Sequence, residues 1–227
     1  MFTETDEYPI TIIRKPVRRV RMRVMADGTV RVTAPRGFDV SEFIAANKGW
    51  IAARHAEMDR LIGADDATPD QMLVSGIWYT VQFGERCHID HAQQMITASD
   101  PLALRQHLTD EFRALINASI TARAKEMDVS FGRCAIRMQK TRWGSCSSAG
   151  NLNINLKVYA LPLPLMDYIV VHELAHRKVL NHSRAFWSEV ALYYPAYKSA
   201  EKDLRRYWII IERNRWWNAI QNAKGGK

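Results

Sequence analysis

One helix-like segment, residues 164–176, constrains the fold more than any other part of the chain. Its residues are apolar almost all round, yet they include His172 and Glu173, and the segment closes on His176. A helix that is apolar on every side is buried, and ionisable groups on it need a partner that offsets their lost hydration. Positions i and i+4 of a helix lie one above the other, so His172 and His176 can offer two imidazoles to one metal ion.

Glu173 adds the group that hydrolysis requires. It lies about 100° round the helix from His172, close to the metal but outside its coordination positions. Zinc lowers the pKa of a bound water to about 7, and a carboxylate at this place can take the proton as the water attacks a carbonyl. The motif therefore predicts one Zn²⁺ per chain, with Glu173 as the catalytic acid/base.

His182 is the natural third ligand, provided that the helix ends in time. On an unbroken helix it would point about 240° away from His176. Asn181 is suited to end the helix in the left-handed conformation, and Ser183 to cap a following helix from Arg184 to Tyr194. This corner would bring His182 to the metal and leave the fourth position open, as in catalytic zinc sites. Glu189 is the alternative third ligand.

Further motifs surround this segment. They are Thr141–Ser148, Gly150–Asn155, Tyr168–His176, Asn181–Ser183, Phe186-Trp187 and, near the N-terminus, Asp27-Gly28, Val32–Pro35 and Trp50-Ile51. In these motifs the chain resembles the YgjP-like metallopeptidases, bacterial proteins regarded as zinc-dependent peptidases and related to the WLM and SprT-like proteases. The resemblance covers most of the chain, from about residue 10 to 210. It implies His172, His176 and His182 as zinc ligands and Glu173 as the acid/base, and it implies no particular substrate.

The expected fold is α+β, with a zincin-like core in which a small twisted sheet packs on the helix of His172 and Glu173. Residues 1–63 should form an N-terminal subdomain of a β-hairpin, turning at Asp27-Gly28, and a helix over 40–62. The metallopeptidase core should cover 72–224. Its expected elements are short strands within 72–97, a helix over 101–127 and strands at 133–138 and 151–158, after a linker at 63–70.

Candidate substrate contacts come from the segment before the metal helix. The strand around Asn153 and Asn155 alternates polar and apolar residues, so we expect an edge strand that pairs with an extended peptide, unless it is an ordinary internal strand. Arg142 and Trp143 could contact substrate or the oxyanion, or could serve packing alone. The phenols that could act as oxyanion donors are those of Tyr193, Tyr194 and Tyr197. Phe186 and Trp187 are expected to support the ligands.

The remaining histidines and the cysteines favour simpler interpretations. Cys87, His88 and His91 could form a second metal site only if a turn brought them together. Cys134 and Cys146 are more typical of buried thiols than of metal ligands. Three cysteines leave one over for any disulfide scheme, so we expect a bacterial cytoplasmic protein. No apolar run approaches the length of a membrane span, and no partner membrane is expected.

Charge suggests a further partner. The formal charge of +8 and the pI near 9.5 predict a positive surface that attracts nucleic acid or acidic proteins. Basic residues gather at 14–23 and from Lys198 to the end, the second group mixed with Trp208, Trp216 and Trp217. That mixture is found on nucleic-acid surfaces, but the tryptophans of a helix following Pro195 can equally pack inward.

Two classes of function therefore remain. The first is a zinc metallopeptidase that hydrolyses peptide bonds of a peptide or protein, with a DNA-associated protease of the SprT/WLM type as a variant. The second is a basic nucleic-acid-binding module with a structural zinc. Glu173 favours the first, because a structural site needs no general base and commonly has four protein ligands.

Overall fold

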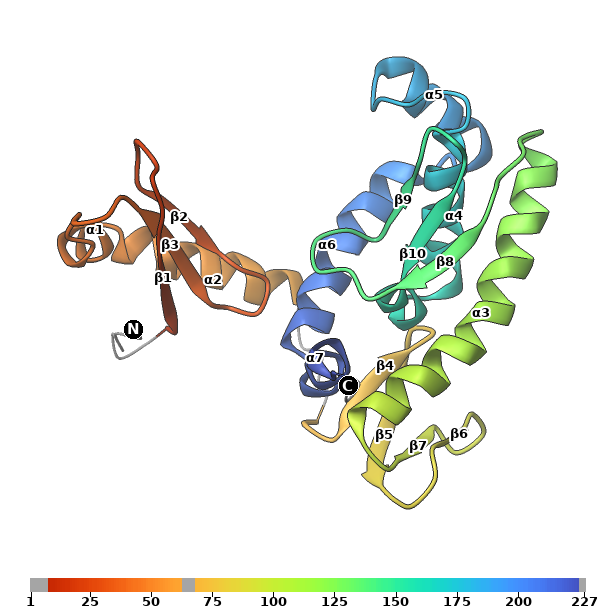
Figure 1. Cartoon of the computed structure of the whole chain (residues 1–227), viewed down its shortest axis with the longest axis horizontal. Coiled ribbons are helices and arrows are strands. Elements are labelled where there is room, and N and C mark those ends of the chain that lie inside the picture. Colours follow the sequence, from red (N-terminus) through yellow and green to blue (C-terminus); the bar gives the residue numbers. More distant parts are fainter. Residues whose placement is uncertain (1–7, 63–67, 225–227) are drawn as a thin grey trace. The chain divides into compact units, whose positions relative to one another are not determined.

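The computed structural model describes residues 8–62 and 68–224, and the fold is mixed α and β (Figure 1). The chain forms two compact units, Met1–Asp66 with Arg206–Arg213 and Ala67–Arg205 with Asn214–Lys227. The expected linker at 63–70 falls mostly on residues 63–67, which lie outside the described residues. The expected core of 72–224 took in residues 206–213, whereas the structure groups them with the first unit.

The first unit contains a three-stranded sheet with two helices on one face. Its elements are β1 (Ile10–Arg14), β2 (Arg21–Val24), β3 (Val30–Ala34), α1 (Ser41–Ala46) and α2 (Lys48–Ile62). The strand order is β1-β3-β2, with β1 parallel and β2 antiparallel to β3. Asp27 and Gly28 make the β2–β3 turn, where Gly28 has a φ of 86°, a value that favours glycine. The helix expected over 40–62 is divided at Asn47.

The second unit contains two sheets and five α-helices among its described residues. Its elements are β4 (Gln71–Val74), β5 (Ile77–Phe83), β6 (His88–Asp90), β7 (Met95–Ala98), α3 (Pro101–Glu126), β8 (Cys134–Arg137), β9 (Gly144–Cys146), β10 (Leu152–Asn155), η1 (Leu156–Ala160), α4 (Leu163–Ala175), α5 (Arg184–Tyr193), the first part of α6 (Tyr197–Arg213) and α7 (Arg215–Asn222). The sheet orders are β4-β5-β7-β6 and β8-β10-β9.

Helix α3 supports the helix of the metal motif. Asp100 caps its first turn by accepting bonds from the backbone N–H of Leu102 and Ala103. Every fourth residue from Leu104 to Ile120 is then fully buried, which gives α3 one apolar stripe. Arg123 near its end makes a bidentate ion pair with Asp167 of α4. The pair fixes α4 against α3, which also runs beside β8 (Figure 1).

The C-terminal tryptophans are packing residues. Trp216 and Trp217 are buried, and the indole N–H of Trp217 donates to the Leu73 carbonyl at 3.0 Å. The basic residues beside them are ion-paired, Arg215 with Asp70 and Arg213 with Asp59. Trp216 and Trp217 therefore pack inward with Arg213 and Arg215 at the surface, as one of the two interpretations held, whereas Trp208 is half-buried. A search of the described helices for a segment able to span a membrane finds none.

Candidate metal centre

Helix α4 ends earlier than expected, and this early end shapes the site. Ala175 is its last residue and His176 its C-cap, whereas we expected the helix to continue to a left-handed Asn181. Asn181 is absent from the described residues with positive φ, so that part of the prediction is wrong. Residues 177–182 instead leave the helix through turns, starting with Arg177 N–H to Leu174 O at 2.9 Å. This gives the chain room to bring His182 back beside α4.

The three histidines of the motif lie together. One ligand nitrogen from each of His172, His176 and His182 falls within 4.8 Å of the others, and the Nε2 atoms of His172 and His182 are 3.1 Å apart. Phe186 packs against all three rings, with centroid distances of 5.0, 4.5 and 4.7 Å. The alternative ligand Glu189 is outside the cluster and pairs with Lys178 at 2.7 Å.

Burial keeps the imidazoles of His172 and His176 neutral. Burial lowers the pKa of His172 to about 3, and the neighbouring His176 and His182 act in the same direction. Burial also lowers the pKa of His176, whose Nδ1 lies 3.2 Å from the Val179 carbonyl. Neutral imidazole is the form that binds a metal. Three imidazole nitrogens at this spacing fit a divalent ion that prefers nitrogen ligands, and zinc is one.

Glu173 is buried without a partner of its own. Its side chain is 5% exposed, and Oε2 has no hydrogen-bond partner among the described residues. Burial raises its pKa to about 8, although Arg142 acts in the opposite direction. A Cβ added to Gly144 would meet Oε1 of Glu173 at 2.6 Å, so the carboxylate lies directly on the backbone of β9. An isolated buried carboxylate at this place fits a neighbouring cation and its water.

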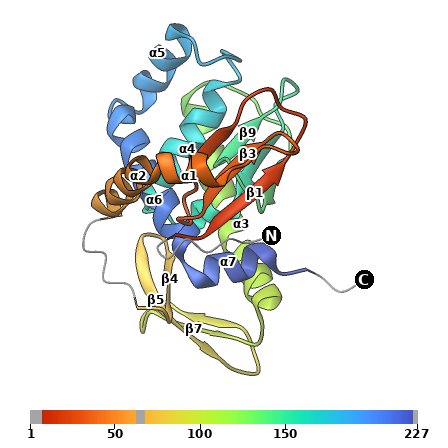
Figure 2. The ribbon, with the colours of Figure 1, turned by 90° about the vertical axis from the view of Figure 1, so that its left-hand side faces the viewer.

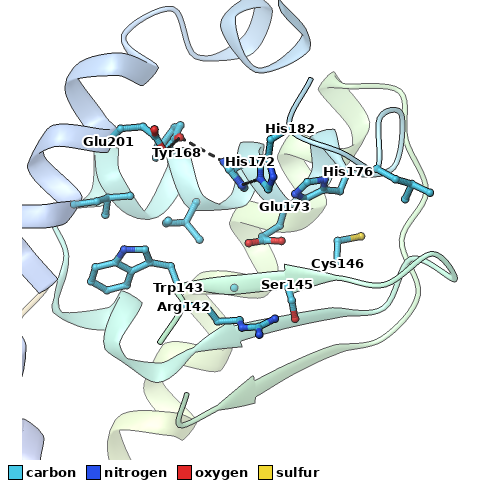
Figure 3. Close-up of a pocket in the computed structure, with 14 residues that line it drawn as sticks. Arg142, Trp143, Ser145, Cys146, Tyr168, His172, Glu173, His176, His182 and Glu201 are labelled. Carbon is cyan, nitrogen blue, oxygen red and sulfur yellow. Dashed lines mark hydrogen bonds between the residues drawn. The ribbon is translucent and has the colours of Figure 1, made fainter. Parts of the chain in front are cut away.

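A cavity of about 440 Å³ opens beside these groups (Figure 3). Glu173 points from α4 toward β9, with Trp143 toward one end of the cavity and Cys146 toward the other. The lining residues are Arg142, Trp143, Gly144, Ser145, Cys146, Tyr168, Ile169, His172, Glu173, His176, Leu180, His182, Glu201 and Leu204. Of the expected contacts, Arg142 and Trp143 therefore line the cavity, whereas Asn153 and Asn155 do not.

The expected edge strand is a central strand. In the order β8-β10-β9, Asn153 and Asn155 lie on β10 between two neighbours, so that prediction is wrong. Asn155 is fully buried, and its amide donates to the carbonyls of Gln139 and Arg142 at 3.0 and 2.7 Å. Asn153 lies 3.5 Å from the Ser145 hydroxyl. The sheet edge next to α4 belongs to the half-buried β9, and the strand expected to run to residue 158 turns into η1 after Asn155.

Comparison with known proteins agrees with the motif. The family model described as YgjP-like, metallopeptidase domain, matches residues 18–207. The chain belongs to the YgjP-like family. Among curated proteins no match was found. Two solved metallopeptidase zymogens are similar: Pyrococcus abyssi abylysin at 26% identity and a TM-score of 0.36, over 40% of this chain and 90% of that one, and Methanocaldococcus jannaschii jannalysin at 24% and 0.35, over 40% and 91%.

In this YgjP-like chain the cavity contains a hydrogen-bonded pair, Tyr168 and Glu201, that the sequence reasoning missed. The Tyr168 hydroxyl donates to Glu201 at 3.1 Å and lies 3.4 Å from Nδ1 of His172 (Figure 3). With Nε2 of His172 turned toward His182, its Nδ1–H can donate to the phenol oxygen and fix the ring. Tyr168 precedes His172 by one helical turn, and that spacing was the available signal. The expected phenols of Tyr193, Tyr194 and Tyr197 do not line this cavity.

The other candidate metal groups do not assemble in this YgjP-like structure. His91 lies in a turn after β6 and bonds the Tyr79 hydroxyl at 2.8 Å. Among the described residues, the three histidines of the motif form the only cluster suited to a metal. Cys134 and Cys146 pair with Leu152 from opposite sides, and all three cysteines are free thiols. Burial raises the pKa of both thiols, as for ordinary buried cysteines.

Proposed function

We propose that this member of a metallopeptidase family is a zinc peptidase with His172, His176 and His182 as its metal ligands. The observation that carries the proposal is the convergence of three imidazoles beside Glu173, a buried carboxylate with one oxygen that has no partner among the described residues. Three protein ligands leave a position open, as catalytic zinc sites do. All four residues fall within the range matched by the family model.

Glu173 would carry the proton transfers. Zinc, when bound, would polarise a peptide carbonyl and lower the pKa of a water. The Glu173 carboxylate would take a proton from the attacking water and pass it to the departing amine. This role requires an ionised carboxylate, and both the nearby Arg142 and the charge of a cation favour that form. Gly144 makes room for the carboxylate at the floor of the cavity.

The free edge of β9 would align the substrate. The Trp143 carbonyl accepts a bond from Asn155, and the Ser147 N–H donates to Asn151, so these residues pair with β10. Because bonding direction alternates along an antiparallel strand, the N–H and C=O groups of Gly144 and Cys146 point to the free edge. An extended peptide can pair there, beside Glu173. Recognition by backbone groups predicts cleavage with little dependence on side-chain sequence.

The residues at the ends of the cavity would determine any preference for particular substrate side chains. Trp143 provides an apolar wall, and Ile169, Leu180 and Leu204 extend it. Arg142 offers a guanidinium that could hold a substrate carboxylate or the oxyanion. An Arg142→Gln variant separates the two roles: loss of carboxylate binding raises KM for acidic peptides, whereas loss of oxyanion stabilisation lowers kcat for all peptides.

Metal content and turnover of matched variants test the proposal. Elemental analysis should find about one zinc per chain in the wild type and much less in His182→Ala. Glu173→Gln should keep the zinc and the fold but lose hydrolysis of unstructured peptides. Glu189→Gln is the matched control, expected to keep both. A His182→Ala variant that retains full zinc would refute the three-histidine site.

The same variants address a structural zinc, the second class of function. A purely structural site would tolerate Glu173→Gln without any functional change, because it needs no general base. A wild type that binds zinc tightly but never cleaves peptides, and that behaves as Glu173→Gln does in every assay, would favour that reading.

A further inference from the structure

The sheet of the first unit has one covered face and one open face. Ile10, Val30, Val32 and Ala34 pack against residues of α1 and α2 in the core of this unit. Both helices lie on this side of the sheet (Figures 1 and 2). Side chains alternate along a strand, so the residues between these positions point to the other face. The segment of α6 in this unit bonds to the end of α2, at Ile62.

The open face is a row of arginines. Arg21 and Arg23 on β2 and Arg31 on β3 are exposed, and all occupy the alternate positions that point away from the helices. Arg23 and Arg31 are direct partners across the antiparallel pair. Like charges placed opposite each other destabilise a sheet. None of the three makes an ion pair with any residue in the described ranges, and β1, β2 and β3 contain no acidic residue.

The preceding loop adds to this charge. Arg18 and Arg19 are exposed in the connection from β1 to β2. Arg14 differs, because its guanidinium bonds the carbonyls of Pro35 and Phe38 and so has a structural use. The five exposed arginines that remain, Arg18, Arg19, Arg21, Arg23 and Arg31, are called the arginine face below. The repulsion among these arginines lowers the stability of the unit, and no acidic side chain of the sheet offsets it. This arrangement indicates that the arginines bind an anion from outside the chain.

We propose that the arginine face binds the phosphate backbone of double-stranded nucleic acid without preference for base sequence. Arg21 and Arg23 are about 6.7 Å apart along the strand, and Arg31 is about 5 Å across from Arg23. A duplex presents one phosphate charge per roughly 1.7 Å of its axis, whatever its sequence, and so can meet charges packed this closely. An acidic peptide could match this spacing only if it carried several acidic residues in succession. Guanidinium groups also bind phosphate in a bidentate manner.

Two other anionic partners fit less well. Binding of single strands relies on aromatic side chains that stack on bases, and β1, β2 and β3 contain none. Membrane surfaces are held by basic residues together with apolar side chains that insert among the lipids. Among the described residues of this unit, the exposed large apolar side chains are those of Phe38 and Trp50, and neither lies on the sheet. The open face therefore offers guanidinium groups beside the half-buried Thr11, Ile13 and Thr33, and its described residues include no large exposed apolar side chain.

Binding of a labelled DNA duplex of about 24 base pairs to the full chain, followed by fluorescence anisotropy, tests the proposal. The variant is Arg21→Gln/Arg23→Gln/Arg31→Gln. The control, Lys48→Gln/Arg54→Gln/Arg60→Gln, removes the same charge from exposed positions of α2. The arginine variant loses up to three phosphate contacts, so its affinity for the duplex should fall by up to about 500-fold at 0.1 M salt. The slope of log K against log salt concentration should become shallower by about 2.7. The control should lose less than about threefold.

Further measurements guard against misinterpretation. The triple variant should melt at or above the wild-type temperature, because it relieves the repulsion between Arg23 and Arg31. Should the triple variant fail to fold, the single variants Arg23→Gln and Arg31→Gln should each bind the duplex up to about eightfold more weakly than the wild type. Glu173→Gln should bind DNA as the wild type does, so failure of the proposed peptidase activity leaves this test unaffected.

Four outcomes would overturn the proposal, the last of them a strong preference for one of two unrelated duplex sequences. The first is equal loss in both triple variants, which would mean that net charge alone acts. The second is competition by polyglutamate as strong as that by unlabelled duplex, which would indicate an acidic protein partner. The third is no duplex binding by the wild type even at about 0.05 M salt. Equal affinity for two unrelated duplex sequences is the expected result, and a strong preference for one would contradict backbone recognition.

Discussion

The burial of Glu173 predicts how the stability of the metal-free protein depends on pH. The ordinary pKa of this carboxyl is 4.5, and burial raises it to about 8. The native state therefore holds the proton more tightly than the unfolded chain does. The wild type should lose stability as pH rises from about 4.5 to about 8, because over this range the unfolded chain releases the proton while the native state still holds it. Replacing Glu173 with Gln removes that titration.

The magnitude follows from the two pKa values. At about 1.4 kcal/mol for each unit of pKa, raising the pH from 5 to 9 should cost the wild type about 4 kcal/mol relative to Glu173→Gln. His172 does not disturb this comparison. Its pKa is lowered to about 3, so its stabilising contribution is complete above about pH 6.5 and is lost as pH falls toward 3. Both proteins share that loss.

Urea unfolding of the metal-free proteins, measured at intervals between pH 5 and 9, provides the assay. The difference in free energy of unfolding between Glu173→Gln and wild type should grow with pH in favour of the variant. Glu85→Gln, at an exposed turn, is the matched control and should follow the wild type. Parallel pH profiles for the wild type and Glu173→Gln would refute the assigned burial. Saturating zinc should reduce the difference, because a cation favours the carboxylate.

Three further predictions concern residues around the cavity. Gly144→Ala should lower peptidase activity by about 100-fold with zinc retained, since the added Cβ would displace Glu173. Gly49→Ala is its control and should leave activity unchanged, because a Cβ added there has no heavy atom within 4 Å. Tyr168→Phe should weaken zinc affinity, measured by chelator competition, by roughly 10- to 100-fold. Asn155→Ala should lower the free energy of unfolding by about 2–4 kcal/mol, measured in urea, because it leaves buried backbone groups unpaired; loss of activity without loss of stability would contradict that structural role.

The sequence predicted most of the metal motif and many of the elements. The spacing of His172 and His176 requires only that one helix passes through both, and the apolar surroundings of that helix gave its burial. Helix α3 was predicted within one residue at its end because a capping Asp, a proline and a long apolar period agree. The Asp27-Gly28 hairpin was predictable because few residue pairs favour that turn.

The end of α4 was harder to predict, for a physical reason. Residues 177–194 contain no glycine or proline that would stop a helix, so Asn181 looked like the first plausible stop. In the structure the helix ends at Ala175, and Arg177 then bonds the carbonyls of Ser130 and Ser148. These bonds connect residues far apart in the chain. A helix end that depends on such tertiary bonds leaves no local signal.

The position of β10 shows the same limit and explains why the role expected of it belongs to β9. A strand with alternating polar and apolar residues has the same sequence pattern at the edge and in the middle of a sheet, because the alternation indicates only which face of the sheet is buried. The real edge, Gly144–Cys146, is short and poor in strand-forming residues, so no propensity marks it. Its glycine is explained by the site: a side chain at 144 would occupy the space of the Glu173 carboxylate. The feature that weakens β9 as a strand therefore lets the carboxylate reach the edge where we propose that substrate binds.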